Sequence, residues 1–274
     1  MTKTIINGQP GHLIDINDRG LNYGDGFFTT AKVVNAKVQL WPLHLARLSE
    51  CARRLGFGDL DFAALEQDVA QLLNTCEGSR EHPLEQPAVL KVLYTRGSGG
   101  RGYAPPSDVQ PTRILSLLPY PDAYKDIAQK GLSLSVAKTR LAQQPLLAGL
   151  KTLNRLEQVF IKQEAAQKNS DDLLVLDTTD KVIETSSANL LMYKQGQWYT
   201  PSLDQAGVQG VYLAHLQERM PVIRCQLNLA QVLSMDTVFC CNSLMGLVPI
   251  TRIAHHDFNL DVAHSLLVKQ GIKI

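Results

Sequence analysis

The sequence predicts a mixed α/β fold in two domains. Three observations support this prediction. In the first half, strand-like segments alternate with helix-like segments, whereas in the second half a series of short strand-like segments follows one helical segment. Between them, Pro119 and Pro121 bracket a stiff segment through which neither a helix nor a sheet ladder continues. We therefore expect a small N-terminal α/β domain at 1–118, a linker at 119–125 and a larger C-terminal domain at 126–274.

Several strands and one hairpin are expected in the first half. Residues 4–7 predict a strand that ends in the turn dipeptide Asn7–Gly8, and residues 29–41 predict a hairpin that turns near Asn35–Ala36. Further strands are expected at 88–95 and 112–118, after a polar loop at 77–87.

Two helices are expected between these strands. Pro42 is typical of a first helical position, and the spacing of the apolar residues after it predicts a buried face at Leu45, Leu48, Ala52 and Leu55. Four further residues are expected on another face of this helix: His44, as a structural residue, with Arg47, Cys51 and Arg54. A second helix is expected at 62–74.

The second half is predicted to contain mostly strands. A strand at 132–138 precedes a helix at 154–167, whose apolar positions include Leu156, Val159 and Phe160. The other expected segments are strands at 172–177, 182–184, 189–193 and 236–241, a loop at 204–210 that leads into a helix, and a closing helix at 261–269.

Composition excludes several functional classes. The 274 residues are 45% hydrophobic and 19% charged, with a formal net charge of +1, which is typical of a soluble globular enzyme. This charge predicts neither nucleic-acid binding nor membrane-surface binding. Because no signal-peptide or membrane-span pattern occurs, we expect a cytoplasmic protein. The cysteines lack zinc-site spacing and are expected to be reduced thiols without a metal: Cys51, Cys76, Cys225, Cys240 and Cys241.

Lys151 and Glu184 are the candidate catalytic residues. Lys151 follows the apolar segment LLAGL, and an apolar setting favours the neutral amine that can form a Schiff base with an aldehyde. Glu184 lies on the return strand of an expected hairpin, where a carboxylate can hold a pyridine nitrogen protonated. A solvated lysine and a water-facing carboxylate are the alternative interpretations.

Three further segments could bind an anion. The Arg47 guanidinium suits a phosphate, and a phosphate also accepts backbone N–H groups from turns such as Val208–Gln209 and Asn242–Ser243. The loop R-G-S-G-G-R-G-Y at 96–103 is neither a Walker loop nor a dinucleotide fingerprint. Its Arg96, Arg101 and Tyr103 suit an aromatic-like substrate that carries carboxylates. A polar helix face, ordinary connecting turns and a flexible loop are the respective alternatives.

Taken together, these segments resemble the fold-type-IV pyridoxal-phosphate enzymes, which include branched-chain aminotransferases, D-amino-acid aminotransferases and 4-amino-4-deoxychorismate lyases. The resemblance covers nearly the whole chain, in order. It is carried by D-R-x-x-x-x-G-D-G at 18–26, H-x-x-R-L at 44–48, K-T-L-N-R-L-E-Q-V at 151–159 and E-T-S-S-A-N-L-L at 184–191.

The resemblance implies a small α/β domain, a larger domain with a barrel-like sheet, and a homodimer. It also implies pyridoxal 5'-phosphate as the cofactor. Lys151 would form the Schiff base, Glu184 would pair with the pyridinium nitrogen, and Arg47 would bind the phosphate. The expected backbone ligands of the phosphate are Val208, Gln209, Asn242 and Ser243.

Two features favour the lyase branch of this family. The loop at 96–103 resembles that branch, and Phe28 stands where D-amino-acid aminotransferases carry a tyrosine. The implied reaction is an elimination that converts 4-amino-4-deoxychorismate to 4-aminobenzoate and pyruvate in folate biosynthesis, with Thr30, Arg96, Arg101 and Tyr103 near the substrate. An aminotransferase of the same fold, for D-amino or branched-chain amino acids, remains an alternative. A cofactor-binding protein without turnover is a further alternative, which Lys151 disfavours.

Overall fold

The computed structural model describes residues 3–74, 87–108, 110–124 and 126–272. Contacts within the chain divide it into a first unit, Met1–Tyr120 with Leu150–Asn154, and a second unit, Pro121–Gly149 with Arg155–Ile274. Cys76 and all of the loop expected at 77–87 except Pro87 lie outside the described residues. No helix within the described ranges is long and apolar enough to span a membrane.

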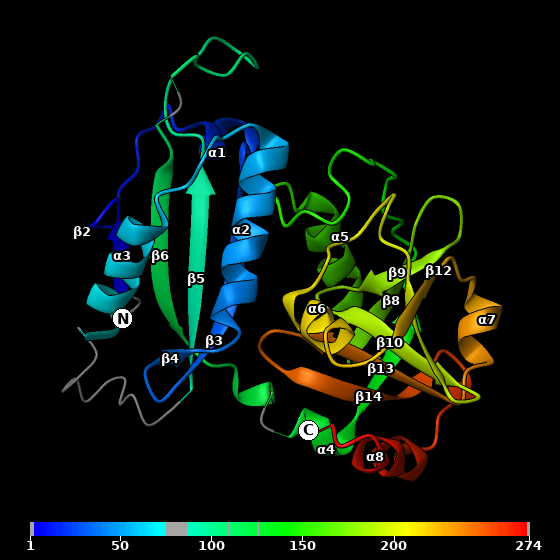
Figure 1. The fold of residues 1–274 in the computed structure, drawn as a ribbon. Coiled ribbons are helices and arrows are strands. Elements are labelled where there is room, and N and C mark those ends of the chain that lie inside the picture. The colour runs from blue at the N-terminus through cyan, green and yellow to red at the C-terminus, as the bar shows by residue number, and fades with distance from the viewer. Residues whose placement is uncertain (1–2, 75–86, 109, 125, 273–274) are drawn as a thin grey trace. The chain divides into compact units, whose positions relative to one another are not determined.

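The first unit is built on an antiparallel sheet of six strands in the order β2-β1-β6-β5-β3-β4 (Figure 1). These strands are β1 (Lys3–Ile6), β2 (Gln9–Pro10), β3 (Gly26–Val34), β4 (Lys37–Val38), β5 (Ala88–Thr95) and β6 (Thr112–Pro119). The predicted hairpin is confirmed, because Asn35 and Ala36 take φ values of 49° and 57° between β3 and β4. The short helix α1 (Arg19–Tyr23) precedes β3 and was not predicted.

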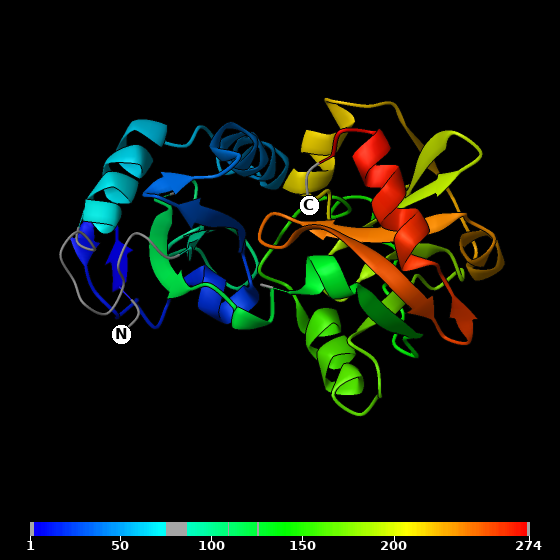
Figure 2. The same ribbon diagram turned by 90° about the horizontal axis from the view of Figure 1, so that it is seen from below.

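Two longer helices pack on one face of this sheet, α2 (Trp41–Leu55) and α3 (Phe62–Asn74) (Figure 2). Both helices are confirmed. His44 and Cys51, which were expected on a face apart from the four apolar positions, are also buried, at 0% and 1% exposure. The helix packs against β3 through a stripe wider than the four predicted positions, and Thr29 of β3 supplies a partner for the His44 ring.

The second unit contains a closed ring of six strands in the order β10-β13-β14-β7-β8-β9. Its members are β7 (Leu132–Val136), β8 (Asp172–Leu176), β9 (Val182–Thr185), β10 (Asn189–Lys194), β13 (Thr237–Asn242) and β14 (Gly246–Ile253). The ring closes where Glu184 of β9 pairs with Asn189 of β10. The expected barrel-like sheet is thereby confirmed, and its closing pair includes a candidate catalytic residue.

Smaller elements complete the second unit. The strands β11 (Gln197–Pro201) and β12 (Val222–Cys225) extend the sheet from β10, and β15 (His256–Asp257) pairs with β14. The helices are α4 (Ile127–Lys130), α5 (Leu156–Ala165), α6 (Val211–Gln217), α7 (Leu229–Leu233) and α8 (Leu260–Lys269). Successive side chains of the strands alternate between two hydrophobic clusters, so that Cys240 and Cys241 enter different ones.

The helix predicted at 154–167 is confirmed as α5, and its predicted apolar positions are exposed. Leu156, Val159 and Phe160 are 72%, 48% and 57% exposed, and Ile161 is the residue of this helix that enters the core. Periodicity identifies an apolar stripe, but it does not say whether the same chain covers that stripe.

Candidate functional site

Lys151 is positioned by backbone pairing with β3. The N–H of Phe28 donates to the Lys151 carbonyl over 2.9 Å, and the N–H of Leu153 donates to the Gly26 carbonyl over 3.0 Å. Leu150 and Thr152 are buried, whereas Lys151 between them is half-buried. The alternation follows from the extended backbone, which turns successive side chains to opposite faces. Lys151 therefore points away from the core of the first unit.

The Lys151 side chain lies against an aromatic ring. Its Nζ is 4.6 Å from the centroid of Phe28, and Nζ of Lys91 on β5 is 5.3 Å from the same centroid. Behind this face, the backbone N–H of Lys151 donates to the buried Cys51 thiol of α2. Burial raises the pKa of the Cys51 thiol, which favours its neutral form.

Arg47 and His44 differ in charge although they lie one turn apart on α2. Burial lowers the pKa of the Arg47 guanidinium to about 10, so Arg47 remains a cation at neutral pH. Burial, with the nearby charge of Arg47, lowers the pKa of His44 to about 3, so its ring is neutral. His44 Nδ1 and Thr29 Oγ1 are 2.6 Å apart. His44 thus helps fix α2 on the sheet, and Arg47 supplies the positive charge.

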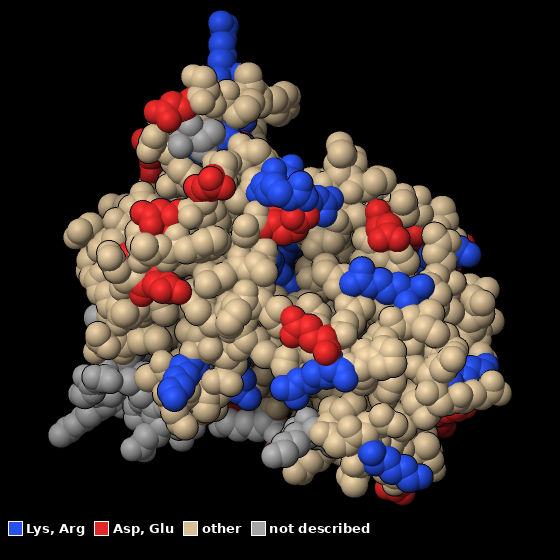
Figure 3. Space-filling view, in the orientation of Figure 1, with Lys and Arg blue, Asp and Glu red and all other residues tan. Residues whose placement is uncertain are grey.

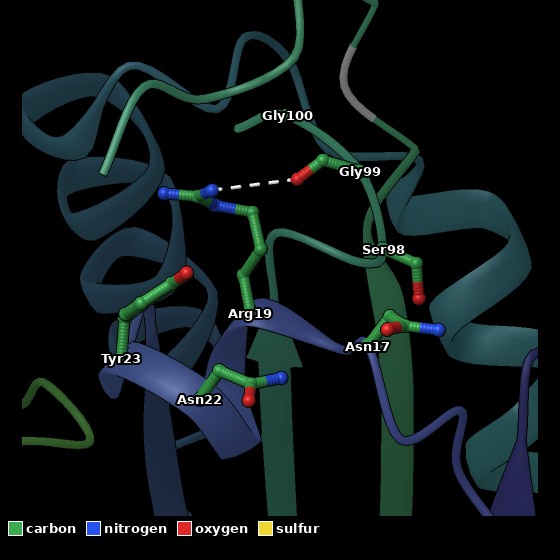
Figure 4. A pocket seen from close by; sticks show the side chains of 7 residues that line it. All are labelled: Asn17, Arg19, Asn22, Tyr23, Ser98, Gly99 and Gly100. Atoms are coloured by element: carbon green, nitrogen blue, oxygen red, sulfur yellow. Dashed lines mark hydrogen bonds between the residues drawn. The ribbon is translucent and has the colours of Figure 1, made fainter. Parts of the chain in front are cut away.

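The glycine-rich loop at 97–104 is held by Arg19, a residue that the sequence analysis identified only as part of the motif at 18–26. Arg19 is 3% exposed, and its guanidinium donates to the carbonyls of Gly99, Gly102, Tyr103 and Ala104 over 3.0–3.4 Å. Figure 4 shows the bond to Gly99 beside a pocket of about 500 Å³. The pocket is lined by Asn17, Arg19, Asn22, Tyr23, Ser98, Gly99 and Gly100.

Asp25 joins Arg19 to Arg96. Its Oδ2 accepts from Nε of Arg19 over 3.0 Å and from Nε of Arg96 over 2.8 Å. Burial acts to raise the pKa of Asp25, but hydrogen bonds from Arg96 and Arg19 outweigh it and hold this pKa below its usual value. The carboxylate therefore stays charged between two cations.

The expected substrate role of Arg96 is not supported by these contacts. Arg96 is 7% exposed and also donates to the carbonyls of Leu55 and Gly56 over 2.7 and 2.9 Å. Its guanidinium carbon lies 4.2 Å from the Phe57 ring centroid. The Arg96 side chain therefore links three segments of the first unit. The sequence around Arg96 did not predict these contacts, because Asp25, Leu55 and Gly56 lie in distant segments of the chain.

The other residues expected near the substrate lie on more accessible surface of the first unit. Arg101 and Tyr103 are exposed on the loop that Arg19 holds, and the Tyr103 ring packs edge-on against Tyr23 at 5.5 Å. Thr30 is half-buried on β3 and pairs with Lys91, on the sheet face that carries Phe28.

In the second unit, Glu184 is buried at 6% exposure at the end of β9. Its Oε2 accepts from the N–H of Val208 over 3.0 Å, and Nδ2 of Asn189 donates to the Val208 carbonyl over 2.8 Å. Gly207, with φ of 85°, allows this approach, because a Cβ there would lie 2.6 Å from Ile183 and 3.3 Å from Glu184 Oε2. The Glu184 carboxylate is therefore fixed in place.

The backbone donors predicted at Val208 and Gln209 are already used. The Val208 N–H binds Glu184, and the Gln209 N–H donates to the Gly149 carbonyl over 3.0 Å. The N–H of Gly149 in turn donates to the Gly207 carbonyl over 2.9 Å. These N–H groups hold Glu184 and the chain just before Lys151, and their contact with a phosphate stays a prediction.

Asn242 shapes the turn between β13 and β14. Its Oδ1 accepts from the N–H groups of Leu244 and Met245, each over 2.9 Å, and its Nδ2 donates to the Ser187 carbonyl over 3.3 Å. The turn that presents Ser243 is thus preformed by a neighbouring side chain.

The described residues form neither a large surface patch of one charge on the face shown nor a metal-binding group. On the face shown in Figure 3, basic and acidic side chains are interspersed. Among the described residues, no group of three or more His, Cys, Asp or Glu side chains could hold a metal ion.

Comparisons with known proteins agree on one family. A model of the amino-transferase class IV family matches residues 26–253. An aminodeoxychorismate lyase from Vibrio harveyi is 34% identical over 262 residues, which cover 93% of each chain. A putative branched-chain-amino-acid aminotransferase from Methanocaldococcus jannaschii is 26% identical over 88% of this chain and 82% of that protein.

A solved structure of a relative has a similar fold. The 4-amino-4-deoxychorismate lyase from Pseudomonas aeruginosa has a TM-score of 0.86 and 38% identity, over 97% of this chain and 98% of that chain. The chain belongs to the class IV aminotransferase family, as its sequence motifs, its closed six-stranded ring and these relatives all indicate.

Proposed function

We propose that this protein is a pyridoxal-phosphate-dependent lyase that converts 4-amino-4-deoxychorismate to 4-aminobenzoate and pyruvate. The observation that carries the proposal is full-length similarity, at 34% and 38% identity, to two proteins named as lyases for that substrate. The glycine-rich loop, which Arg19 holds in a defined shape with Arg101 and Tyr103 exposed, supports the same branch.

The residues present fit the cofactor that this family uses. The chain offers a half-buried amine at Lys151, a buried and oriented carboxylate at Glu184, and a guanidinium at Arg47. These groups match an aldehyde, a pyridine nitrogen and a phosphate, respectively. When bound, pyridoxal phosphate supplies a ring that takes up the electron pair left at the carbon beside the substrate amine.

Lys151 carries the proton transfers in this proposal. Its amine would hold the cofactor aldehyde until the substrate amine takes its place. The free amine removes the proton from the amine-bearing ring carbon and delivers a proton to the departing enolpyruvyl group, which becomes pyruvate. The carbon–oxygen bond breaks as the ring becomes aromatic, so the step needs no oxidant and no second keto acid.

Glu184 and Arg47 support that chemistry without moving protons to the substrate. The Glu184 carboxylate, fixed by Val208, would keep the ring nitrogen protonated by its opposite charge. Arg47 would bind the phosphate, and the turn at Asn242–Ser243 would offer the phosphate backbone donors. Gly149 pairs with Val208, whose N–H binds Glu184. Along the chain, Gly149 is separated from Lys151 only by Leu150. This connection supports a shared role for Glu184 and Lys151.

The substrate carries two carboxylates, and Arg101, Tyr103 and Thr30 are the proposed contacts. Arg101 offers a planar set of donors that matches a carboxylate. Arg96 is left out, because its side chain is committed to Asp25 and to two backbone carbonyls.

We also propose a cytoplasmic homodimer. The support is the apolar surface on α5, where Leu156, Val159 and Phe160 are all exposed at helical spacing. A stripe of this kind is typical of a protein–protein contact. A second copy of this chain is the proposed occupant.

A product assay tests the function. Incubation with 4-amino-4-deoxychorismate should release 4-aminobenzoate and pyruvate in equal amounts without added keto acid, and Lys151→Ala should release neither. The aminotransferase alternative is supported by similarity to the putative branched-chain-amino-acid aminotransferase from Methanocaldococcus jannaschii. Conversion of branched-chain amino acids or D-alanine with 2-oxoglutarate, together with no reaction on aminodeoxychorismate, would replace the lyase assignment.

A further inference from the structure

We propose that Arg19 is a positioning residue that sets the affinity for the substrate, because it fixes the glycine-rich loop at 97–104 in one conformation. That conformation exposes Arg101 and Tyr103, the two loop residues proposed to contact the substrate. Arg19 and the loop both belong to the first unit. The effect on affinity rests on the proposed function, and Arg19 acts on the substrate only through the loop.

The Arg19 guanidinium lies beneath the loop and gathers its backbone carbonyls (Figure 4). Arg19 is 3% exposed, and its Nε binds Asp25, so the other two nitrogens remain for the loop. Because a guanidinium is planar, its N–H groups have fixed directions, and the carbonyls that accept from them must point to one place. The acceptors, at 3.0–3.4 Å, are the carbonyls of Gly99, Gly102, Tyr103 and Ala104.

The backbone of the loop is shaped for this contact. Gly100 has a φ of 77°, and a Cβ there would lie 2.3 Å from the Ala104 carbonyl oxygen and 3.2 Å from Nη1 of Arg19. A side chain at this position would push the Ala104 carbonyl away from the guanidinium. Glycine at this position therefore serves one defined conformation, and the loop is more than a flexible connection between β5 and β6.

The base of the loop is held separately, by the side chain of Asp18. Its Oδ2 accepts from Oγ1 of Thr95, the last residue of β5, over 2.7 Å and from Oγ1 of Thr112, the first residue of β6, over 3.0 Å. The backbone N–H of Arg19 adds a bond to the Gly97 carbonyl over 2.9 Å. Removal of the Arg19 side chain alone should therefore release the middle of the loop and leave the two strands joined.

Loss of the Arg19 side chain would lower substrate affinity through the population of the loop conformation. Without their shared donor, the four carbonyls no longer favour one conformation, and the loop gains conformational entropy by sampling others. When only a fraction of the chains is competent to bind, the apparent affinity falls by that fraction. If the presenting conformation falls to about a tenth of the population, KM rises about tenfold. Saturating substrate restores that conformation, so kcat changes little.

Limited proteolysis of the full chain measures the loop without turnover. Trypsin cleaves after arginine in a segment that can open, so the rate of cleavage after Arg101 follows the population of open loop. Arg19→Met should raise this rate about tenfold or more. The matched control is Arg113→Met, which takes another partly buried arginine of the first unit from its pair with Asp68. It should leave cleavage after Arg101 unchanged.

Steady-state kinetics with 4-amino-4-deoxychorismate at saturating cofactor measure the effect on the substrate. Arg19→Met should raise KM about tenfold or more and change kcat by less than about threefold. Arg19→Lys keeps the charge beside Asp25 but lacks the planar set of donors, so KM should rise here too. In a chain that already carries Arg101→Met and Tyr103→Ala, Arg19→Met should add little, because the contacts through which it acts are gone.

A second variant disturbs the loop while leaving Arg19 in place. Gly100→Ala should speed cleavage after Arg101 and raise KM, because its Cβ displaces the Ala104 carbonyl. Its matched control is Gly58→Ala. Gly58 has a φ of 75° with no atom within 4 Å of the Cβ position, so this change brings similar backbone strain outside the loop. It should alter neither the cleavage rate nor KM.

Four results would overturn the proposal. They are unchanged cleavage after Arg101 in Arg19→Met, an unchanged KM in that variant, a normal KM in Arg19→Lys, and a full additional rise in KM when Arg101 and Tyr103 are already replaced. Circular dichroism checks that each variant is folded, and Gly100→Ala gives the answer if Arg19→Met is not. An unmodified chain without lyase activity counts against the proposed function, whereas the trypsin result tests Arg19 without turnover.

Discussion

The backbone N–H of Val208 donates a hydrogen bond to Oε2 of Glu184 across 3.0 Å, next to the strand pair that closes the barrel. This contact orients a buried carboxylate that would otherwise be costly to hold charged. It also engages a donor that the sequence suggested for a phosphate. The first prediction follows from this pair.

Glu184→Gln should impair turnover more than cofactor retention. The variant keeps an oxygen that can accept from Val208 but loses the negative charge that favours a protonated ring nitrogen. An opposite charge nearby is worth roughly 1–3 pKa units, so the rate should fall roughly 10- to 1000-fold. Steady-state rates and cofactor titration measure the two effects, and near-normal turnover with cofactor bound would remove this role from Glu184.

Lys151 should carry the covalent cofactor. Borohydride reduction followed by peptide mass mapping should place the label on Lys151, because its amine is half-buried against Phe28. Lys151→Ala should keep some cofactor without a covalent bond and lose turnover by roughly 10²–10⁴-fold or more. Lys138→Ala serves as the control and should stay active. Label on Lys138 or Lys162 would show that another lysine holds the cofactor.

Arg47→Ala should weaken cofactor binding by ~1.5–3 kcal/mol, the range for a hydrogen bond to a charged group. The matched control is Arg53→Ala on the same helix, where Arg53 is exposed and pairs with Glu50. Fluorescence titration with pyridoxal phosphate compares the two variants. Equal affinities would mean that Arg47 does not bind the phosphate.

Asp25→Asn should destabilise the first unit. Removing one partner of a fully buried ion pair costs roughly 3–5 kcal/mol, and the loss of the half-buried carboxylate that Arg19 and Arg96 share should cost less than that. Urea unfolding measures the loss, and Glu50→Gln, which breaks an exposed pair, should change little.

The same carboxylate predicts a dependence on pH. Its pKa in the folded state is lowered from 3.8, so its contribution is fully present above pH 3.8 and is lost as the pH falls through the lower folded value. Acid unfolding of Asp25→Asn should therefore be less steep than that of the unmodified chain. Identical acid transitions would contradict the assignment of this ion pair.

Phe160→Glu should dissociate the proposed dimer, because it places a charge in the apolar stripe of α5. Val268→Glu makes the same kind of change at an exposed position of α8 and is the control. Sedimentation velocity should find monomer for Phe160→Glu and dimer for Val268→Glu. A monomeric unmodified chain would end the dimer proposal.

The sequence by itself determined most elements and the family. Each of these elements depends on only a few neighbouring residues, so it can be predicted from local sequence. Examples are the turn dipeptide Asn35–Ala36, the proline in the first turn of α2 and the apolar spacing in α3. The motifs around Lys151, Glu184 and Arg47 identified the family for the same reason, because each is a short contiguous pattern that chemistry constrains.

Only the tertiary structure decided which residues share a task. Arg96 looked like a substrate anchor until Asp25, Leu55 and Gly56 were seen to take up its side chain. Arg19 gained its role from loop carbonyls about 80 residues away. Lys91 and Lys151 lie against the same Phe28 ring only because their segments pair with opposite sides of β3. Such partners are far apart in sequence, and packing alone brings their donors, acceptors and charges within reach of one another.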